Sequence, residues 1–118
     1  TIGIDDNKKF AYRGPWVRLG SSTIVDSFFL GDFSSAEYTI SIELDSNNKE
    51  IIKCLVVAGL EKADIVIYGR ASTGAELIDL SARVNRSFVE LTATPKSTRA
   101  QEAKIVYTGQ LFKTQTPL

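Results

Sequence analysis

The sequence feature that most limits the fold is a strict alternation of apolar and polar residues over Ala36–Leu44. One parity holds Tyr38, Ile40, Ile42 and Leu44, and the other holds Glu37, Thr39, Ser41 and Glu43. Successive side chains of a β-strand point to opposite faces of a sheet, so this segment is predicted to be a strand with one buried face. Such a strand is typical of an antiparallel sheet whose other face meets solvent.

A second alternating segment, Ser87–Pro95, is predicted to be a neighbouring strand. Its apolar parity is made of Val89, Leu91 and Ala93. Pro95 is expected to end the strand, because proline has no backbone N–H to donate to the next strand. Phe88 falls on the polar parity, and we therefore expect it to make a second contact on that side.

Several other segments are predicted to be strands from their β-branched and aromatic residues: Ser22–Phe29, Ile51–Ala58, Asp64–Arg70 and Lys104–Phe112. Ile51–Ala58 and Asp64–Arg70 are apolar on both parities, which predicts strands covered on both faces. Glu76–Val84 fits either a short helix or a strand, and we favour a strand because its neighbours are strands.

About seven to eight short strands separated by turn residues predict an all-β fold, an antiparallel β-sandwich of the jelly-roll or Ig-like kind. The 118 residues are expected to form one domain. We divide it into an N-terminal arm at 1–20, the sandwich at 21–112 and a C-terminal tail at 113–118. The arm is irregular in sequence and packs either on its own domain or across a neighbour. Methionine is absent even at position 1, so the initiator was removed or the chain is a piece of a longer protein.

The charge balance limits the classes of partner. Fourteen basic residues balance fourteen acidic ones, whereas binding to nucleic acid or to anionic lipid needs a basic surplus. No apolar run is long enough to cross a membrane. We therefore expect neither nucleic acid nor membrane as a partner. A neutral chain has little self-repulsion, which suits a protein packed among other proteins.

The residues for catalysis and metal binding are sparse. Histidine is absent, which removes the commonest general base and the commonest transition-metal ligand. Cys54 lies in an apolar run and is predicted to be a buried thiol. The carboxylates that suit acid–base chemistry by residue type alone are Asp26, Asp64, Glu76, Asp79 and Glu90. We predict no enzyme, no catalytic residues, no cofactor and no metal.

The large aromatic residues are the best candidates for contacts with partners. Tryptophan and other aromatics are enriched at the centres of protein interfaces, which gives as interface candidates Tyr12, Trp16, Phe28 and Phe112. Trp16 ranks first among them because it lies in the irregular arm. In the alternative hypothesis, Trp16 and Tyr68 form a platform that stacks on sugar rings.

Taken in order, five segments resemble a β-rich structural domain of tailed-phage particles, of the kind found in myoviruses and marine cyanophages. These segments are Val25–Phe28, Ser35–Ile40, Leu55–Gly59, Ile67–Gly69 and Phe88–Pro95. In that family the domain occurs in tail-fibre, baseplate and other virion proteins. The resemblance covers about Ser22–Phe112 and implies no catalytic residue. Where the family has a His-Asp-Gly turn, this chain has Ala58-Gly59-Leu60.

The resemblance implies a non-enzymatic structural subunit in the tail, baseplate or fibre-attachment region of a virion. We expect other virion proteins as partners and a homo-oligomer or several copies in a symmetric assembly. Free sheet edges at Ser22–Phe29 or Lys104–Phe112 are predicted to pair with a neighbouring chain. The alternatives are a carbohydrate-binding receptor-recognition module and a capsid decoration protein.

Overall fold

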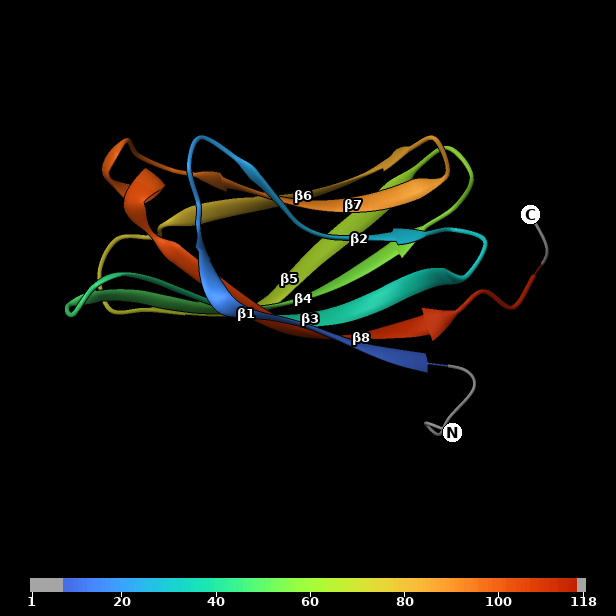
Figure 1. Cartoon of the computed structure of the whole chain (residues 1–118), viewed down its shortest axis with the longest axis horizontal. Coiled ribbons are helices and arrows are strands. Elements are labelled where there is room, and N and C mark those ends of the chain that lie inside the picture. Colours follow the sequence, from blue (N-terminus) through green and yellow to red (C-terminus); the bar gives the residue numbers. More distant parts are fainter. Residues whose placement is uncertain (1–7, 117–118) are drawn as a thin grey trace.

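The computed structural model describes the backbone of residues 8–116 and the side chains of residues 19–116. This part of the chain is a two-layer sandwich of antiparallel strands (Figure 1). The larger sheet has the strand order β1 (Lys8–Arg18), β8 (Lys104–Lys113), β3 (Phe33–Asp45), β4 (Asn48–Ala58) and β5 (Ala63–Ser72). The smaller sheet has the order β2 (Thr23–Phe29), β7 (Phe88–Pro95) and β6 (Ile78–Asn85). The predicted antiparallel β-sandwich is therefore confirmed.

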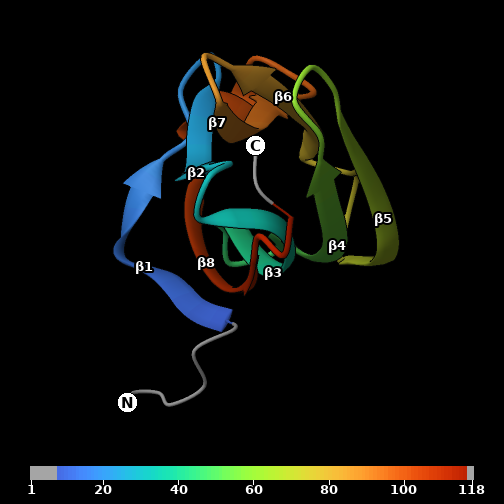
Figure 2. The same cartoon turned by 90° about the vertical axis from the view of Figure 1, so that its right-hand side faces the viewer.

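The strand order is that of a jelly roll at the two ends of the chain. β1 pairs with β8 in one sheet, and β2 pairs with β7 in the other. This nesting of first with last strands differs from the Ig-like arrangement. β3, β4 and β5 then continue the larger sheet as a meander. Figure 2 shows the consequence end-on: β1 and β5 form the two margins of the larger sheet, beneath the smaller one.

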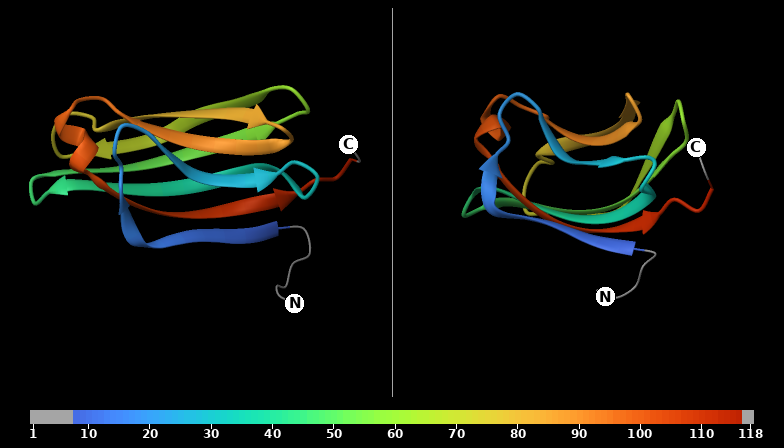
Figure 3. Two further views of the ribbon diagram at one scale, coloured as in Figure 1. Left: turned by 45° about the horizontal axis from the view of Figure 1, so that its top comes forward. Right: turned by 45° about the vertical axis from the view of Figure 1, so that its right-hand side comes forward.

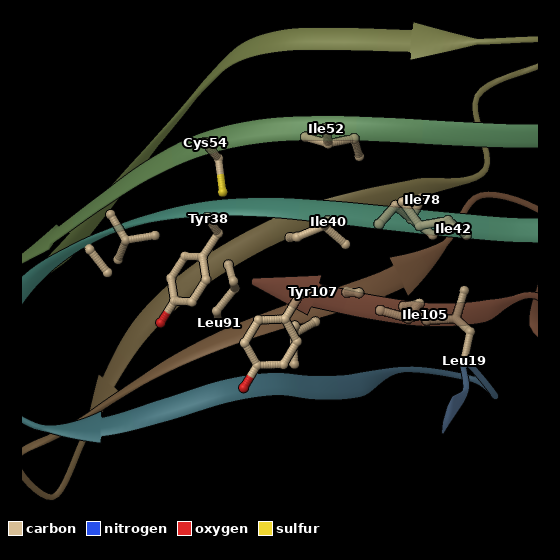
Figure 4. Close-up of a cluster of buried hydrophobic side chains, with 14 of the residues drawn as sticks. Leu19, Tyr38, Ile40, Ile42, Ile52, Cys54, Ile78, Leu91, Ile105 and Tyr107 are labelled. Atoms are coloured by element: carbon tan, nitrogen blue, oxygen red, sulfur yellow. The ribbon is translucent and has the colours of Figure 1, made fainter. Parts of the chain in front are cut away.

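The core lies between the two sheets and is made of the inward parity of each strand. The alternations predicted for β3 and β7 are confirmed, because Tyr38, Ile40, Ile42, Val89, Leu91 and Ala93 are all buried. Figure 4 shows Tyr38, Ile40, Ile42 and Leu91 with Ile52 and Cys54 of β4. It also shows Tyr107 of β8, whose ring lies edge-on to Tyr38. Their burial supplies the main favourable free energy of folding.

The structure resolves the one segment whose secondary structure the sequence left ambiguous. Ile78–Asn85 is strand β6, so the strand alternative for Glu76–Val84 is confirmed. Arg99–Glu102, between β7 and β8, is a short 3₁₀ helix that buries Ala100. No helix in the described part of the chain is long and apolar enough to cross a membrane.

Residues of the predicted N-terminal arm belong to the sandwich. Lys8–Arg18 is strand β1, and Tyr12 lies opposite Thr108 of β8. Of the two alternatives left open for the arm, this part packs on its own domain. The same pairing makes one prediction wrong: Lys104–Phe112 is not a sheet edge, because β8 lies between β1 and β3. The other predicted edge, in Ser22–Phe29, is confirmed for β2.

The prediction that the strands of Ile51–Ala58 and Asp64–Arg70 are covered on both faces is wrong for the isolated chain. In β4 the inward side chains are buried, whereas the outward Leu55 and Val57 are about half exposed. β5 is exposed along most of its length. The physical reason is the layer order, because within the described residues nothing packs on the outer face of the larger sheet (Figure 3).

Candidate functional site

The outer face of the larger sheet bears a cluster of exposed apolar side chains at the end where β4 and β5 meet. We call this the outer patch: Leu55, Val57, Val66 and Phe112, which are 48, 55, 52 and 37% exposed. Strand register brings them together. Leu55 lies opposite Val66, and Ser35 lies between Val57 and Phe112. Exposed apolar side chains that gather in this way mark interaction surfaces more often than isolated ones do.

A shallow hollow of about 330 Å³ lies on this patch. Its lining residues are Ser35, Ala36, Leu55, Val56, Val57, Asp64, Val66 and Phe112. Asp64 is the charged residue among them, at the margin where β5 ends the sheet. The hollow is therefore suited to an apolar side chain of a partner rather than to a small polar molecule.

Next to the outer patch, Tyr68 provides an aromatic ring beside polar groups. Its side chain is about half exposed, and its hydroxyl donates a hydrogen bond to Oε2 of Glu37 on β3. That bond raises the pKa of Tyr68 above its ordinary value. A second hollow, of about 180 Å³, is lined by Glu37, Thr39, Lys53, Thr108, Gly109 and Gln110. This region has the donors and acceptors that the outer patch lacks.

The structure separates the predicted interface residues. Phe112 lies in the outer patch, and Tyr68 lies beside it. Phe28 is instead a core residue, 5% exposed. The cause is a β-bulge in β2 between Ile24 and Asp26, which lets Val25 and Phe28 both point inward although they are three residues apart. The side chains of Tyr12 and Trp16 lie outside the described residues.

The next residue, Phe29, has the surface exposure that an interface residue needs and that Phe28 lacks. It is exposed and packs against Phe88 with ring centroids 5.5 Å apart. This contact confirms the second contact predicted for Phe88 on the polar side of β7. The two rings lie on the smaller sheet, away from the outer patch.

Four of the five candidate carboxylates are engaged in contacts within the fold. Asp26 accepts a hydrogen bond of 2.6 Å from the Tyr38 hydroxyl. Glu90 binds Arg83, and that hydrogen bond lowers the pKa of Glu90. Glu76 and Asp79 both bind Lys96, and the hydrogen bond from Lys96 lowers the pKa of Glu76. The fifth, Asp64, lines the apolar hollow. The contacts seen for four of these carboxylates are with cations, with a buried phenol and, for Glu90, also with the Asn85 amide.

Cys54 is buried between the sheets, and burial raises the pKa of its thiol to about 11. A thiol with so high a pKa is a poor nucleophile near neutral pH.

Within the described residues there is also no group of three or more acidic, cysteine or histidine side chains that could hold a metal ion. Asp45 accepts hydrogen bonds from Asn47 and Asn48, as expected for a hairpin turn.

One buried polar cluster was missed from the sequence. Glu50 of β4 is 3% exposed and accepts hydrogen bonds from Arg70, Ser72 and the Leu77 backbone N–H. Arg70 also donates to the Ile78 carbonyl. The signal was present, because Glu50 shares the parity of the inward Ile52 of the same strand. The cluster fastens β5 and the start of β6 to β4.

No protein-family description matches the chain, and no protein of curated function matches it. Matching solved structures include the tailspike protein of Acinetobacter baumannii phage AM24, which is 10% identical with a TM-score of 0.44 over 93% of this chain. They also include the tailspike protein of Acinetobacter phage vB_ApiP_P1, which is 17% identical with a TM-score of 0.46 over 95% of this chain. This chain spans 26% and 22% of the length of those proteins.

Proposed function

We propose that the protein is a non-enzymatic β-sandwich module of a phage particle, located in the tail, baseplate or fibre-attachment region. It acts by contact with other virion proteins through the outer patch. The phage assignment comes from the sequence resemblance of Ser22–Phe112 to virion structural domains of myoviruses and cyanophages. The assembly role is supported by the surface of the larger sheet.

The observation that supports the assembly role is that apolar residues of β4 and β5 lie exposed on the outer face of the larger sheet. β4 and β5 have apolar residues on both parities, which is the composition of strands covered on both faces. The smaller sheet lies over the inner side of the larger sheet, and the described chain offers no cover for the outer side. In this proposal another protein chain provides the second cover.

The energetics agree with a partner protein. Complete burial of a Val, Leu or Phe side chain is worth about 1.5–3 kcal/mol each. The outer patch holds four such side chains that are each more than a third exposed. Polar residues at its margins, including Glu37 and Lys53, would form the rim that surrounds the apolar centre of a protein interface.

The test compares two lysine substitutions at matched exposure on opposite outer faces. Leu55→Lys changes a residue that is 48% exposed in the outer patch, and Ile24→Lys changes one that is 45% exposed on the smaller sheet. Both variants should fold, as judged by circular dichroism. We expect Leu55→Lys to be excluded from particles and Ile24→Lys to be incorporated. Normal incorporation of a folded Leu55→Lys protein would refute the proposal.

A second candidate function, binding of a carbohydrate receptor, is favoured by Tyr68. An exposed aromatic ring beside a hollow lined by carboxylate, hydroxyl, amide and ammonium groups is suited to a sugar. This hypothesis predicts glycan-array binding that Tyr68→Ala abolishes and that Tyr68→Phe and Leu55→Lys retain. Array binding that persists in Tyr68→Ala would count against it.

A further inference from the structure

The two sheets end in four edge strands within the described residues: β1 and β5 in the larger sheet, β2 and β6 in the smaller. An edge strand presents unpaired backbone N–H and C=O groups, which can pair with a strand of another chain. Proteins discourage such pairing with proline, charged residues and bulges. The four edges differ sharply in these features.

Three of the edges have features that discourage pairing. β1 contains Pro15 and four basic residues in its sequence, and its register is interrupted between Arg13 and Val17. β2 is bulged between Ile24 and Asp26. β6 has highly exposed charges at Asp79 and Arg83. Each of these features opposes the addition of a flat neighbouring strand.

β5 has neither proline nor charge over its central part. It is ten residues long, and Ile65–Gly69 contains no charge and no proline. Its exposed apolar side chains lie on both faces: Val66 and Tyr68 point outward, and Ile67 pairs with the inward Cys54 and is still 36% exposed. Its irregularity is at Tyr68, so Ala63–Ile67 is regular. A long apolar edge of this kind is a pairing site.

We propose that β5 pairs antiparallel with β5 of a second copy of this chain, about a two-fold axis at Val66. This register is isologous, so each copy presents the same edge to the other. Val66 meets Val66 of the second copy on the outer face. Ile65 meets Ile67 of the second copy on the inner face. Both residues belong to that face because their partners on β4, Val56 and Cys54, point inward and are buried.

The electrostatics of this register also favour a second copy. Asp64 meets Tyr68 of the second copy on the outer face, so no two like charges stand directly opposite one another over Asp64–Tyr68. The whole chain has a formal net charge of zero, which leaves little long-range repulsion between copies. A two-fold axis repeats each favourable pair, and such isologous contacts are the commonest in homo-oligomers.

This pairing deepens the proposed function, on which it rests for its biological role. It joins the two five-stranded sheets into one continuous sheet. The two outer patches then lie on the same continuous face, because Leu55 is directly across from Val66 within each copy. The dimer would thus present a doubled apolar surface to the rest of the particle.

The test uses the whole chain with a charge placed on the proposed axis. Val66→Lys and Val66→Glu each put two like charges opposite one another, and each should raise the dimer dissociation constant at least about tenfold. An equimolar mixture of the two variants should restore dimers, because lysine then faces glutamate. Val106→Lys is the matched control, since Val106 is an exposed valine in β8 away from the edge. Molar mass is measured by sedimentation and folding by thermal unfolding.

We expect dimers for the unmodified chain, for Val106→Lys and for the mixture, and monomers for each Val66 variant alone. A monomeric unmodified chain, a Val66→Lys dimer or a mixture that stays monomeric would each overturn the pairing. Particle incorporation separates this failure from failure of the proposed function. If only the pairing is wrong, the unmodified chain is monomeric and Leu55→Lys is still excluded from particles, whereas failure of the proposed function lets folded Leu55→Lys protein into particles.

Discussion

Removal of the buried carboxylate of Glu50 should destabilise the fold more than removal of any exposed acidic side chain. Glu50 Oε2 accepts hydrogen bonds from Arg70 Nη1 at 2.8 Å and from Ser72 Oγ at 2.7 Å. Its Oε1 accepts one from the backbone N–H of Leu77 at 3.1 Å. Together these contacts hold the crossing from the larger to the smaller sheet against β4.

The magnitude follows from the groups that Glu50→Ala leaves behind. The Leu77 N–H is buried, and an unsatisfied buried donor costs about 1–3 kcal/mol. Loss of one partner of a buried ion pair costs about 3–5 kcal/mol. Arg70 is 16% exposed and keeps the Ile78 carbonyl and Glu76 as partners, which places the cost at the lower end. We expect a loss of about 3 kcal/mol in the free energy of unfolding.

Urea unfolding followed by circular dichroism measures this loss, and the melting temperature should fall by about 10 °C or more. Ser72→Ala is the matched control, because it removes one of the same hydrogen bonds from an exposed residue. It should cost less than about 1 kcal/mol. If Glu50→Ala also costs less than about 1 kcal/mol, the reasoning about this buried cluster is refuted.

Three further predictions concern residues in or next to the core. Tyr38→Phe removes the hydrogen bond to Asp26 and should cost about 1.5–3 kcal/mol in urea unfolding, and an unchanged midpoint would contradict this. Gly109→Ala places a Cβ 2.5 Å from the Tyr38 ring and should cost about 1–3 kcal/mol, whereas Gly59→Ala, with nothing within 4 Å, should be nearly neutral. Equal effects of the two glycine changes would argue against the close approach. Burial raises the pKa of Cys54 to about 11 from its ordinary value of 9.0, so the unfolded thiol ionises first as pH rises. The contribution of Cys54 to stability should therefore fall between pH 9 and 11, and the native thiol should resist alkylation at pH 8. Rapid alkylation of the folded chain would be inconsistent with this burial.

Much of the fold was predictable because burial on one face leaves a two-residue period in the sequence. That period placed Tyr38, Ile40 and Ile42 correctly on the inner face of β3. It gives no guide where the backbone departs from regular pairing. The bulge in β2 lets Phe28 point inward like Val25, whereas Phe28 was predicted to be an interface residue from its aromatic type alone. The order of strands within a sheet is also set by long-range pairing, which is why β8 was wrongly placed at an edge.

The candidate site was only partly predictable for a similar reason. Phe112 was named as an interface residue, but Leu55, Val57 and Val66 were assigned to strands covered on both faces. Their apolar character was read correctly, and they are exposed because no layer within the described residues covers the outer face of the larger sheet. Tyr68 was linked to sugar stacking by its residue type alone. Its position beside Glu37 required the register of three neighbouring strands.

Hydrogen exchange of the purified chain over a range of concentrations tests the central claim, that the β5 side of the larger sheet meets another chain. Amides of Ala63–Ser72 should become more protected as concentration rises, while amides of the bulged edge strand Thr23–Phe29 should exchange at unchanged rates. Protection of Ala63–Ser72 that does not depend on concentration, or that changes equally in both edges, would contradict the account.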